Sequence, residues 1–374
     1  MGRVIDDRDA RMLLSQWCEA GDRAVGHRVR ERGAVVVAEE ILAGTSPLPA
    51  SAGAAGRVPA GTSLDHALAR WLAPTQSTAS RCGARYVIPG EGEWPTQLDD
   101  LGDGAPLGLW VAGAGNLRLL ALRSLSVVGA RSATAYGELV ARELAAHLAE
   151  NGWLTVSGGA FGIDAAAHRA AVAAGGATAC VLAGGVDVPY PRSHADLLAR
   201  IRESGVLVSE APFGAAAMRH RFLSRNRIIA ALSRGTVLVE AAVRSGGRST
   251  VREARLLNRV VMAFPGPVTS PMSAGCHVVI RDEGVHLVTS PREVVSLVEG
   301  RMPPADEGRR EPVDELGWRE KRVLDSVPVR SPAPLGSIAR IAGLGLTDAM
   351  SALGMLDALG LVERRGDGWT LRRE

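Results

Sequence analysis

Lysine is nearly absent from this chain. Lys321 is the single lysine among 374 residues, so almost all of its 43 basic side chains are arginine. Cysteine is also scarce, since Cys18, Cys82, Cys180 and Cys276 lie far apart and form no Cys-x-x-Cys pair. This spacing argues against a structural zinc site or a disulfide framework, and it fits a reducing compartment.

Long apolar runs are missing as well. No uninterrupted apolar stretch approaches the length of a membrane span, and the first residues, MGRVIDDRDARM, lack the apolar core of a signal peptide. We therefore expect a cytoplasmic protein without a membrane span. The hydrophobic content of 46% still suffices for a sizeable core, and the length of 374 residues predicts two or three folded units.

The net charge of +3 is small, but it is unevenly distributed along the chain. Between Phe213 and Arg259, ten arginines stand against Glu240 and Glu253, which gives this stretch a balance of +8 and leaves −5 for the rest. Such a concentration of basic charge is typical of a site for a polyanion. The alternative is that the arginines are scattered over solvated helix faces.

Strand and helix patterns alternate from Leu125 to Glu299. Strands are expected to begin near residues 125, 153, 178, 206, 236 and 260, with helices at about 137–150, 163–174, 194–203, 222–233 and 249–258. This alternation predicts an α/β fold with a mostly parallel sheet that is covered on both faces. Because ligands of such sheets bind at the carboxyl ends of the strands, function is expected in the loops that follow them. These loops are 129–132, 157–164, 184–190, 209–213, 240–250 and 265–269.

Smaller units are expected on either side of this core. We predict a helical N-terminal unit over residues 1–75 with a flexible segment at 44–61, a core over 82–300, a linker at 301–314 and a last unit over 315–374. In the core, Tyr86–Ile88 and Leu107–Val111 look like strands at a sheet edge. The last unit shows three short helical patterns and two strands joined at Gly366-Asp367-Gly368, which is typical of a winged helix. Its third helix, TDAMSALGMLDALG, has no Arg, Lys, Asn or Gln to read bases, so a role in protein contacts is favoured.

Arg131 is a candidate phosphate ligand. It follows Gly129 and Ala130 at the end of a predicted strand and precedes a helix, so its guanidinium and nearby backbone N–H groups could together hold one phosphate. The alternative is an ion pair between Arg131 and a buried carboxylate, such as Glu240 or Asp164.

One aromatic residue, Phe222, is surrounded by basic residues in a predicted loop that leads into a helix. Its basic neighbours are Arg219, His220, Arg221, Arg225 and Arg227. Single-stranded nucleic acid needs positive charge for its phosphates and a π-face for its unstacked bases, and this stretch offers both. The alternatives are that Phe222 packs in the core and that Asn226 and Arg227 tie down the loop.

Metal and catalytic patterns are weak. Asp164 and His168 lie one turn apart, but a helix cap with a hydrogen-bonded histidine explains them better than a metal site does. No Ser-His-Asp ordering or paired-carboxylate pattern emerges. We expect no cofactor, no metal and no catalytic residue.

Several motifs together resemble the DprA/Smf family of bacterial DNA-processing proteins. They stand in the family's order and spacing over roughly residues 85–291: VVGARSATAYG, SGGAFGIDAAAH, GGVDVPYP, SEAPFG, FLSRNRIIAALS, VLVEAAVRSGG and AFPGPVTSPMSAGCHVVIRDEGV. The resemblance implies an extended Rossmann-like domain that binds single-stranded DNA without catalysis, forms a homodimer and loads the recombinase RecA in natural transformation or recombination. The N-terminal unit is similar to the SAM- or helix-hairpin-helix-like unit of longer members. Departures from the family pattern occur at Gly159 and at Cys276, His277 and Val279.

The family places a DNA-contacting basic residue three positions before the aromatic, which is Arg219 here. Together with the expected ligand position at the carboxyl ends of the strands, this resemblance predicts DNA contacts from Gly129, Arg131, Ser132, Gly158, Arg219, Phe222, Arg225, Asn226, Arg227, Glu240, Ser245 and Gly246.

One enzymatic alternative rests on Gly246–Glu253, which looks like the G-G-x-G-T-x-x-E motif of nucleoside-monophosphate phosphoribohydrolases. In that motif a glycine-rich turn holds phosphate and the glutamate acts on the ribose. This chain has Ser249 in place of a loop glycine and lacks the preceding proline, so lost catalysis on a shared fold explains it better. A third interpretation, a winged-helix transcription regulator, is weakened by the poor recognition helix.

Overall fold

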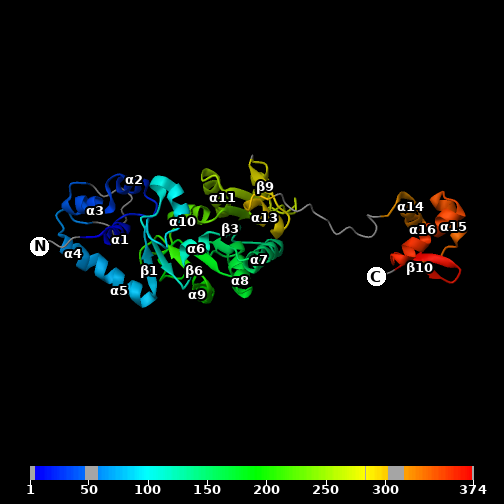
Figure 1. Ribbon diagram of the computed structural model, residues 1–374, viewed down its shortest axis with the longest axis horizontal. Coiled ribbons are helices and arrows are strands. Elements are labelled where there is room, and N and C mark those ends of the chain that lie inside the picture. The colour runs from blue at the N-terminus through cyan, green and yellow to red at the C-terminus, as the bar shows by residue number, and fades with distance from the viewer. Residues whose placement is uncertain (1–4, 47–57, 283, 302–315, 373–374) are drawn as a thin grey trace. The chain divides into compact units, whose positions relative to one another are not determined.

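A computed structural model describes residues 5–46, 58–282, 284–301 and 316–372. It divides the chain into two units, Met1–Pro303 and Pro304–Glu374 (Figure 1). Most of the predicted flexible segment at 44–61 and nearly all of the predicted linker at 301–314 lie outside the described residues.

The first unit is built on one large sheet. Among the described residues it has nine strands in the order β1-β2-β6-β5-β4-β3-β7-β8-β9, and those from β3 to β9 pair in parallel, while β1 and β2 are antiparallel at one edge. The strands are β1 Ala84–Val87, β2 Leu109–Ala112, β3 Ser124–Val128, β4 Leu154–Ser157, β5 Thr178–Leu182, β6 Val206–Ser209, β7 Gly235–Leu238, β8 Val260–Ala263 and β9 Val285–Leu287. The predicted α/β class, the parallel core and the two edge strands are confirmed, and β9 is an addition.

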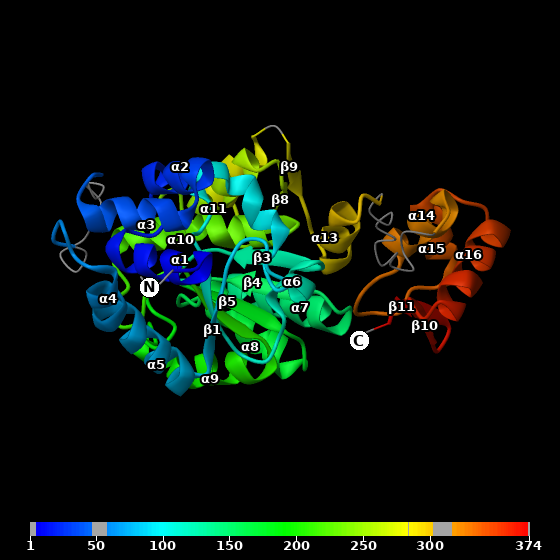
Figure 2. The same cartoon turned by 60° about the vertical axis from the view of Figure 1, so that its left-hand side comes forward.

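Helices cover both faces of this sheet (Figures 1 and 2). On one face lie α7 Ala135–Glu150, α8 Ile163–Ala173 and α9 Ala195–Ser204, and on the other lie α10 Arg219–Leu232 and α11 Gly246–Leu256. The remaining helices of this region are α6 Leu117–Ala121, α12 Ala274–Ile280, α13 Pro291–Val298 and the short 3₁₀ segments Thr96–Gly104 and Arg192–His194.

Strand β3 shows how its sequence allows close packing on both faces. Leu125 and Val127 point into the apolar cluster shared with α7 and α8. Ser124 and Ser126 alternate with them and donate hydrogen bonds to the carbonyls of Leu232 (2.9 Å) and Ile229 (2.8 Å) in α10. Because small side chains stand on that face, α10 lies directly on the strand.

The N-terminal helices share a core with the sheet edge. They are α1 Asp7–Trp17, α2 Arg23–Arg32, α3 Ala34–Ala43, α4 Leu64–Ala67, the π-helical turn Leu68–Leu72 and α5 Ala73–Cys82. Trp17 is buried in one cluster with Tyr86 of β1 and Trp110 of β2. The predicted helical character is confirmed for the described residues, and α5 extends it to Cys82, beyond the predicted end of the unit at residue 75.

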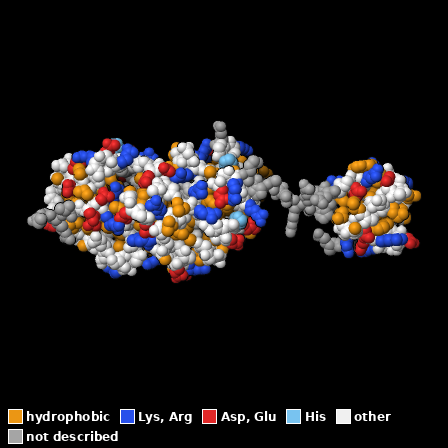
Figure 3. Space-filling view, in the orientation of Figure 1, with side chains coloured by type: hydrophobic (Ala, Val, Ile, Leu, Met, Phe, Trp, Pro, Cys, Tyr) orange, Lys and Arg blue, Asp and Glu red, His pale blue; other side chains and the backbone are white. Residues whose placement is uncertain are grey.

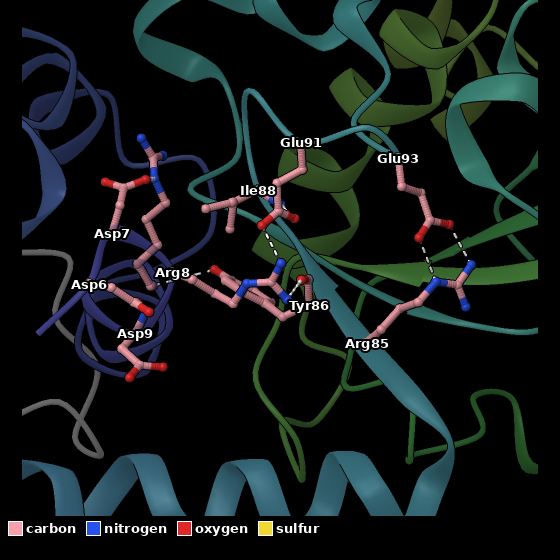
Figure 4. A network of polar contacts seen from close by, with 10 residues as sticks. Asp6, Asp7, Arg8, Asp9, Arg85, Tyr86, Ile88, Glu91 and Glu93 are labelled. Atoms are coloured by element: carbon pink, nitrogen blue, oxygen red, sulfur yellow. Dashed lines mark hydrogen bonds and ion pairs between the residues drawn. The ribbon is translucent and has the colours of Figure 1, made fainter.

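Charged residues fasten α1 to β1, as Figure 4 shows. Arg8 donates to the carbonyl of Tyr86 (3.2 Å) and forms an ion pair with Glu91. On the same strand, the guanidinium of Arg85 meets both carboxylate oxygens of Glu93, with 2.6 Å between Nε and Oε2. The contacts of Arg8 hold α1 against the edge of the sheet, whereas the Arg85–Glu93 pair ties β1 to the loop that follows it.

The second unit contains α14 Trp318–Ser326, α15 Leu335–Ala342, α16 Leu346–Ala358 and the antiparallel pair β10 Val362–Arg365 and β11 Gly368–Leu371. Its own core includes Val323, Ile338, Leu353, Leu356 and Val362. The three helices and the pair of strands joined at Gly366-Asp367 agree with the predicted pattern. The assignment as a winged helix stays a prediction.

Two predicted helix starts are wrong. The helix expected from 222 begins at Arg219, so Arg219 and Phe222 lie in its first turn rather than in a loop. The helix expected from 249 begins at Gly246, because Ser245 caps it and accepts a hydrogen bond from the N–H of Gly247 (3.4 Å).

Candidate nucleic-acid interface

The candidate site lies where the strand order of the sheet reverses. From β3 the chain proceeds outward through β4, β5 and β6, and it then returns to place β7 on the other side of β3. The chain segments that follow β3 and β7 meet there. The backbone N–H of Ala130 donates to the carbonyl of Glu240 (2.7 Å), and the backbone N–H of Val239 donates to the carbonyl of Val128 (3.0 Å). The carboxyl ends of strands at such a point are the usual ligand position in open α/β sheets.

Glu240 organises this loop pair. Its carboxylate accepts hydrogen bonds from the backbone N–H (2.8 Å) and the hydroxyl (2.7 Å) of Thr134, the N-cap of α7. Its side chain is buried, and Gly137 leaves the space in which it sits. Glu240 is therefore engaged inside the protein rather than offered to DNA, in contrast to the sequence-based expectation.

Arg131 is exposed at the mouth of the same loop, and so is Ser132. The Arg131 guanidinium lies over the ring of Phe222, with 4.9 Å between Cζ and the ring centroid. Among the described residues it forms no ion pair with a carboxylate, so the alternative pairing with Glu240 or Asp164 is not what the structure has. Its charge is available to a ligand.

The first turn of α10 presents Arg219 and Phe222 to this mouth. Arg219 is exposed, and Phe222 is half-buried beside Tyr190, with ring centroids 5.5 Å apart. Below them Arg225 turns inward: it is 7% exposed, donates to the carbonyl of Val181 (3.1 Å) and has a buried Nε without a partner among the described residues. One face of the helix thus carries an outer cation, an aromatic ring and an inner cation.

Gly158 makes room for the inner cation. A Cβ atom on Gly158 would stand 1.5 Å from Nη1 of Arg225, so only glycine fits against this guanidinium. The backbone N–H groups of Gly158 (3.2 Å) and Ala160 (3.3 Å) donate to the carboxylate of Asp164. Burial raises the pKa of Asp164, and the nearby charge of Arg225 opposes that shift. Gly158 thus lies against Arg225 and does not line the main groove.

Arg227 and Asn226 have different surroundings. Arg227 is buried, forms an ion pair with Glu210 (2.8 Å) and donates to the carbonyl of Gly104 (2.7 Å). The structure thus supports the alternative that Arg227 ties down its surroundings, and Arg227 does not line the groove. Asn226 is also 7% exposed, yet it lines the groove.

These parts enclose a groove of about 790 Å³. The start of α11 closes it from the far side, where Gly247 packs against Gly129 so closely that an added Cβ would stand 3.0 Å from the Gly129 Cα. The predicted residues that line the groove are Gly129, Arg131, Ser132, Arg219, Phe222, Arg225, Asn226, Ser245 and Gly246, whereas Gly158, Arg227 and Glu240 do not line it.

Among the lining residues that were not predicted as DNA contacts, two have side chains suited to nucleic acid. Tyr190, which is 46% exposed, lies at the end of the predicted loop 184–190, and Arg244 was counted among the basic residues without being singled out. The sequence feature that could have identified Tyr190 is an aromatic side chain in one of the loops predicted at the carboxyl ends of the strands. For Arg244 it is a cation directly before the Ser-Gly-Gly that starts a helix.

His168 belongs to the interior of the protein. Its Nδ1 lies 2.7 Å from the hydroxyl of Thr178, and burial lowers its pKa to about 3. Across the described residues, no group of His, Cys, Asp and Glu side chains has the arrangement to hold a metal ion. In the same part of the chain, no helix is both long and apolar enough to cross a membrane.

Glu253, the residue of the enzymatic alternative, lies on α11 away from the groove lining. Its carboxylate is 3.4 Å from Nη2 of Arg252, and the side chain is 20% exposed. A glutamate that acts on the ribose of a bound nucleotide would have to face the groove, so this position does not favour the phosphoribohydrolase interpretation.

The fold is that of a Rossmann-like α/β protein whose switch point carries a cationic groove with aromatic side chains, a composition suited to a polyanion with exposed rings. The family described as DNA recombination-mediator protein A matches residues 85–299. A DprA DNA-processing protein of Mycobacterium tuberculosis is 44% identical over 305 residues, which cover 78% of each chain. The chain belongs to the DprA/Smf family of DNA-processing proteins.

Solved structures agree with this assignment. The X-ray structure of DprA from Streptococcus pneumoniae has a TM-score of 0.62 and 30% identity, covering 79% of this chain and 98% of that one. DprA from Helicobacter pylori, whose structure describes the single-stranded DNA binding mode of that protein, has a TM-score of 0.51 at 24% identity. It covers 58% of this chain and 96% of that one, and this likeness concerns the fold.

Proposed function

We propose that this protein binds single-stranded DNA in the groove at the switch point, without catalysis, and protects the strand before recombination. The observation that carries the proposal is the stack of Arg131 over Phe222, with Arg225 behind the ring at 5.9 Å. A phosphate-binding cation and a face for an unstacked base are thereby held side by side.

The groove favours a single strand over a duplex. Phe222 and Tyr190 line its wall, and such rings contact bases only when the bases are not already stacked and paired. Phosphates can be held by Arg131, Arg219 and Arg244, which are exposed along the same groove. In the second unit, α16 has no Arg, Lys, Asn or Gln, the residues that make the main bidentate contacts to base edges in a duplex.

We further propose that the protein works as a homodimer in the cytoplasm and hands the strand to the recombinase RecA. This part is supported by membership of the DprA/Smf family. The second unit, proposed to be a winged helix over 315–374, suits protein contacts, because α16 exposes Leu346, Met350 and Met355. Figure 3 shows hydrophobic side chains gathered on the face of this unit that is in view.

A mobility-shift assay with matched single- and double-stranded oligonucleotides tests the binding function. We expect the single strand to bind more tightly than the duplex at equal salt, and equal affinity would contradict the proposal. A parallel assay for base release from nucleoside monophosphates tests the enzymatic alternative. Turnover by the wild-type protein that Glu253→Gln abolishes would favour the phosphoribohydrolase instead.

A further inference from the structure

A second groove of about 880 Å³ continues from the first one over α11. The two grooves share a boundary formed by Leu223, Arg244, Ser245 and Gly246. A ligand that leaves the first groove past this boundary enters the second without crossing any intervening element.

The second groove is strongly basic. Beyond the shared Arg244 it is lined by Arg248, Arg252 and Arg255, and the one carboxylate in its lining is Asp282, which pairs with Arg255 at 2.8 Å. The face of the first unit seen in Figure 3 has basic and acidic side chains interspersed. Counting Glu253, which lies outside the lining but 3.4 Å from Arg252, four arginines stand against two carboxylates, which is still a local excess of positive charge.

These arginines follow the axis of the helix. Arg248, Arg252 and Arg255 are spaced by four and three residues, which puts them on one face of α11, while Gly247 and Ala254 are buried. The distance along the axis from the first to the last is about 10 Å at 1.5 Å per residue. That span equals about three nucleotides at the duplex rise of roughly 3.4 Å per nucleotide, and fewer nucleotides of an extended single strand.

The floor of the second groove offers apolar rather than aromatic surface. Its lining includes Val243, which is 51% exposed, and Leu256, which is 69% exposed. Bases held here would contact aliphatic side chains without the stacking that Phe222 and Tyr190 provide. The second groove should therefore hold a strand through its phosphates, with little selection among bases.

We propose that the second groove is a continuation of the DNA track, in which Arg252 and Arg255 contact the phosphates of a strand already held in the first groove. This inference rests on the proposed function. It predicts that affinity depends on strand length, because a short oligonucleotide fills only the first groove while a longer one also reaches α11.

The test measures the affinity of the wild-type protein and of the double variant R252Q/R255Q for two oligothymidylates of different length. One is about six and the other about twenty nucleotides long, near the lower end and beyond the upper end of the roughly 4–16 nucleotides that one single-strand-binding fold covers. R142Q/R169Q is the matched control, since it removes the same charge from exposed sites on α7 and α8 across the sheet. Arg131→Ala is included to identify binding in the first groove.

For R252Q/R255Q we expect affinity for the long strand to fall about tenfold, which equals roughly 1.4 kcal/mol. Its salt slope should drop by about 1.4, at about 0.7 for each lost contact. The short strand should bind as it does to wild type, the control should bind both lengths normally, and Arg131→Ala should weaken both.

Unchanged binding of the long strand by R252Q/R255Q, or equal weakening of both lengths, would overturn this inference while leaving the first groove intact. Failure of the wild-type protein to bind either length would instead overturn the proposed function and the inference together. The single variant Arg252→Gln, at a side chain that is 73% exposed, keeps the test decisive if the double variant misfolds.

Discussion

The guanidinium of Arg131 lies over the ring of Phe222, with 4.9 Å between Cζ and the ring centroid. The arginine comes from the loop after β3 and the ring from the first turn of α10, so the fold brings together two residues far apart in sequence. Contacts of this kind contribute about 0.5–2 kcal/mol. The pair is thus preorganised, and a bound strand would meet a charge and a ring whose positions are already fixed.

Arg131→Ala and Arg219→Ala are expected to weaken single-strand binding to a similar degree for all sequences. Each should also lower the salt slope by about 0.7, because one phosphate contact and its counterion release are lost. Fluorescence anisotropy at several salt concentrations measures both quantities. Arg142→Ala, an exposed arginine on α7, is the control. Wild-type affinity for both variants, while they remain folded, would place the DNA elsewhere.

Phe222→Ala should act through the base rather than the phosphate. We expect a loss of about 1–3 kcal/mol in binding with a nearly unchanged salt slope, since stacking releases no counterions. Phe222→Tyr keeps the ring and should bind almost normally. Because the ring is half-buried, thermal unfolding of each variant must accompany the binding assay. If the tyrosine variant lost as much affinity as the alanine variant, stacking would not be the cause.

Gly158→Ala should displace Arg225. The added methyl group would stand 1.5 Å from Nη1, so the guanidinium or the backbone must shift, at a cost of about 1–3 kcal/mol in stability. Single-strand binding should fall as well, because Arg225 lies behind Phe222 in the groove. Gly92→Ala, at a glycine with open space around it, is the control for loss of a glycine. Equal unfolding free energies for the two variants would contradict this account.

The strand and helix pattern of the core was readable from the sequence because buried parallel strands form short apolar runs that end in small residues. The strands β3, β4 and β5 and the loop with Arg131 follow that rule directly. The start of α10 was not readable, since Arg219, His220 and Arg221 resemble a loop in composition and Met218 gives no capping side chain. Tertiary contacts, rather than a cap, define that end of the helix.

Side-chain direction was the other quantity that the sequence did not contain. Arg219, Arg225 and Arg227 lie within nine residues of one basic stretch, yet one is exposed, one lines the groove from inside and one pairs with Glu210. Helical spacing alone does not show which of them meets the buried carboxylate of Glu210, which directly follows β6. The arginine count predicted a basic site, and an arginine-lined groove is present, but the count did not separate the arginines that line this groove from those that pair inside the protein.

The contact between Glu19 and Arg221 gives the last prediction. Glu19 follows α1, and its carboxylate accepts two hydrogen bonds from Arg221 of α10, at 2.9 Å from Nε and 2.7 Å from Nη2. These bonds lower the pKa of Glu19, with burial acting in the opposite direction and His220, 3.3 Å away, contributing less. The N-terminal helices thereby hold the turn of α10 that carries Arg219 and Phe222.

A carboxylate whose pKa is lower in the folded state stabilises the fold above its unfolded pKa of about 4.3, and that stabilisation is lost as the pH falls through the folded pKa. Glu19→Gln should therefore lower the free energy of unfolding at pH 7 by up to about 1 kcal/mol, the upper range for partly exposed pairs. The difference from wild type should shrink as the pH falls below about 4. Urea unfolding at a series of pH values measures it, with Glu138→Gln as the control, since that carboxylate is exposed and 3.9 Å from Arg142. A difference that stays constant or grows in acid would show that Glu19 stabilises α10 by packing instead of charge.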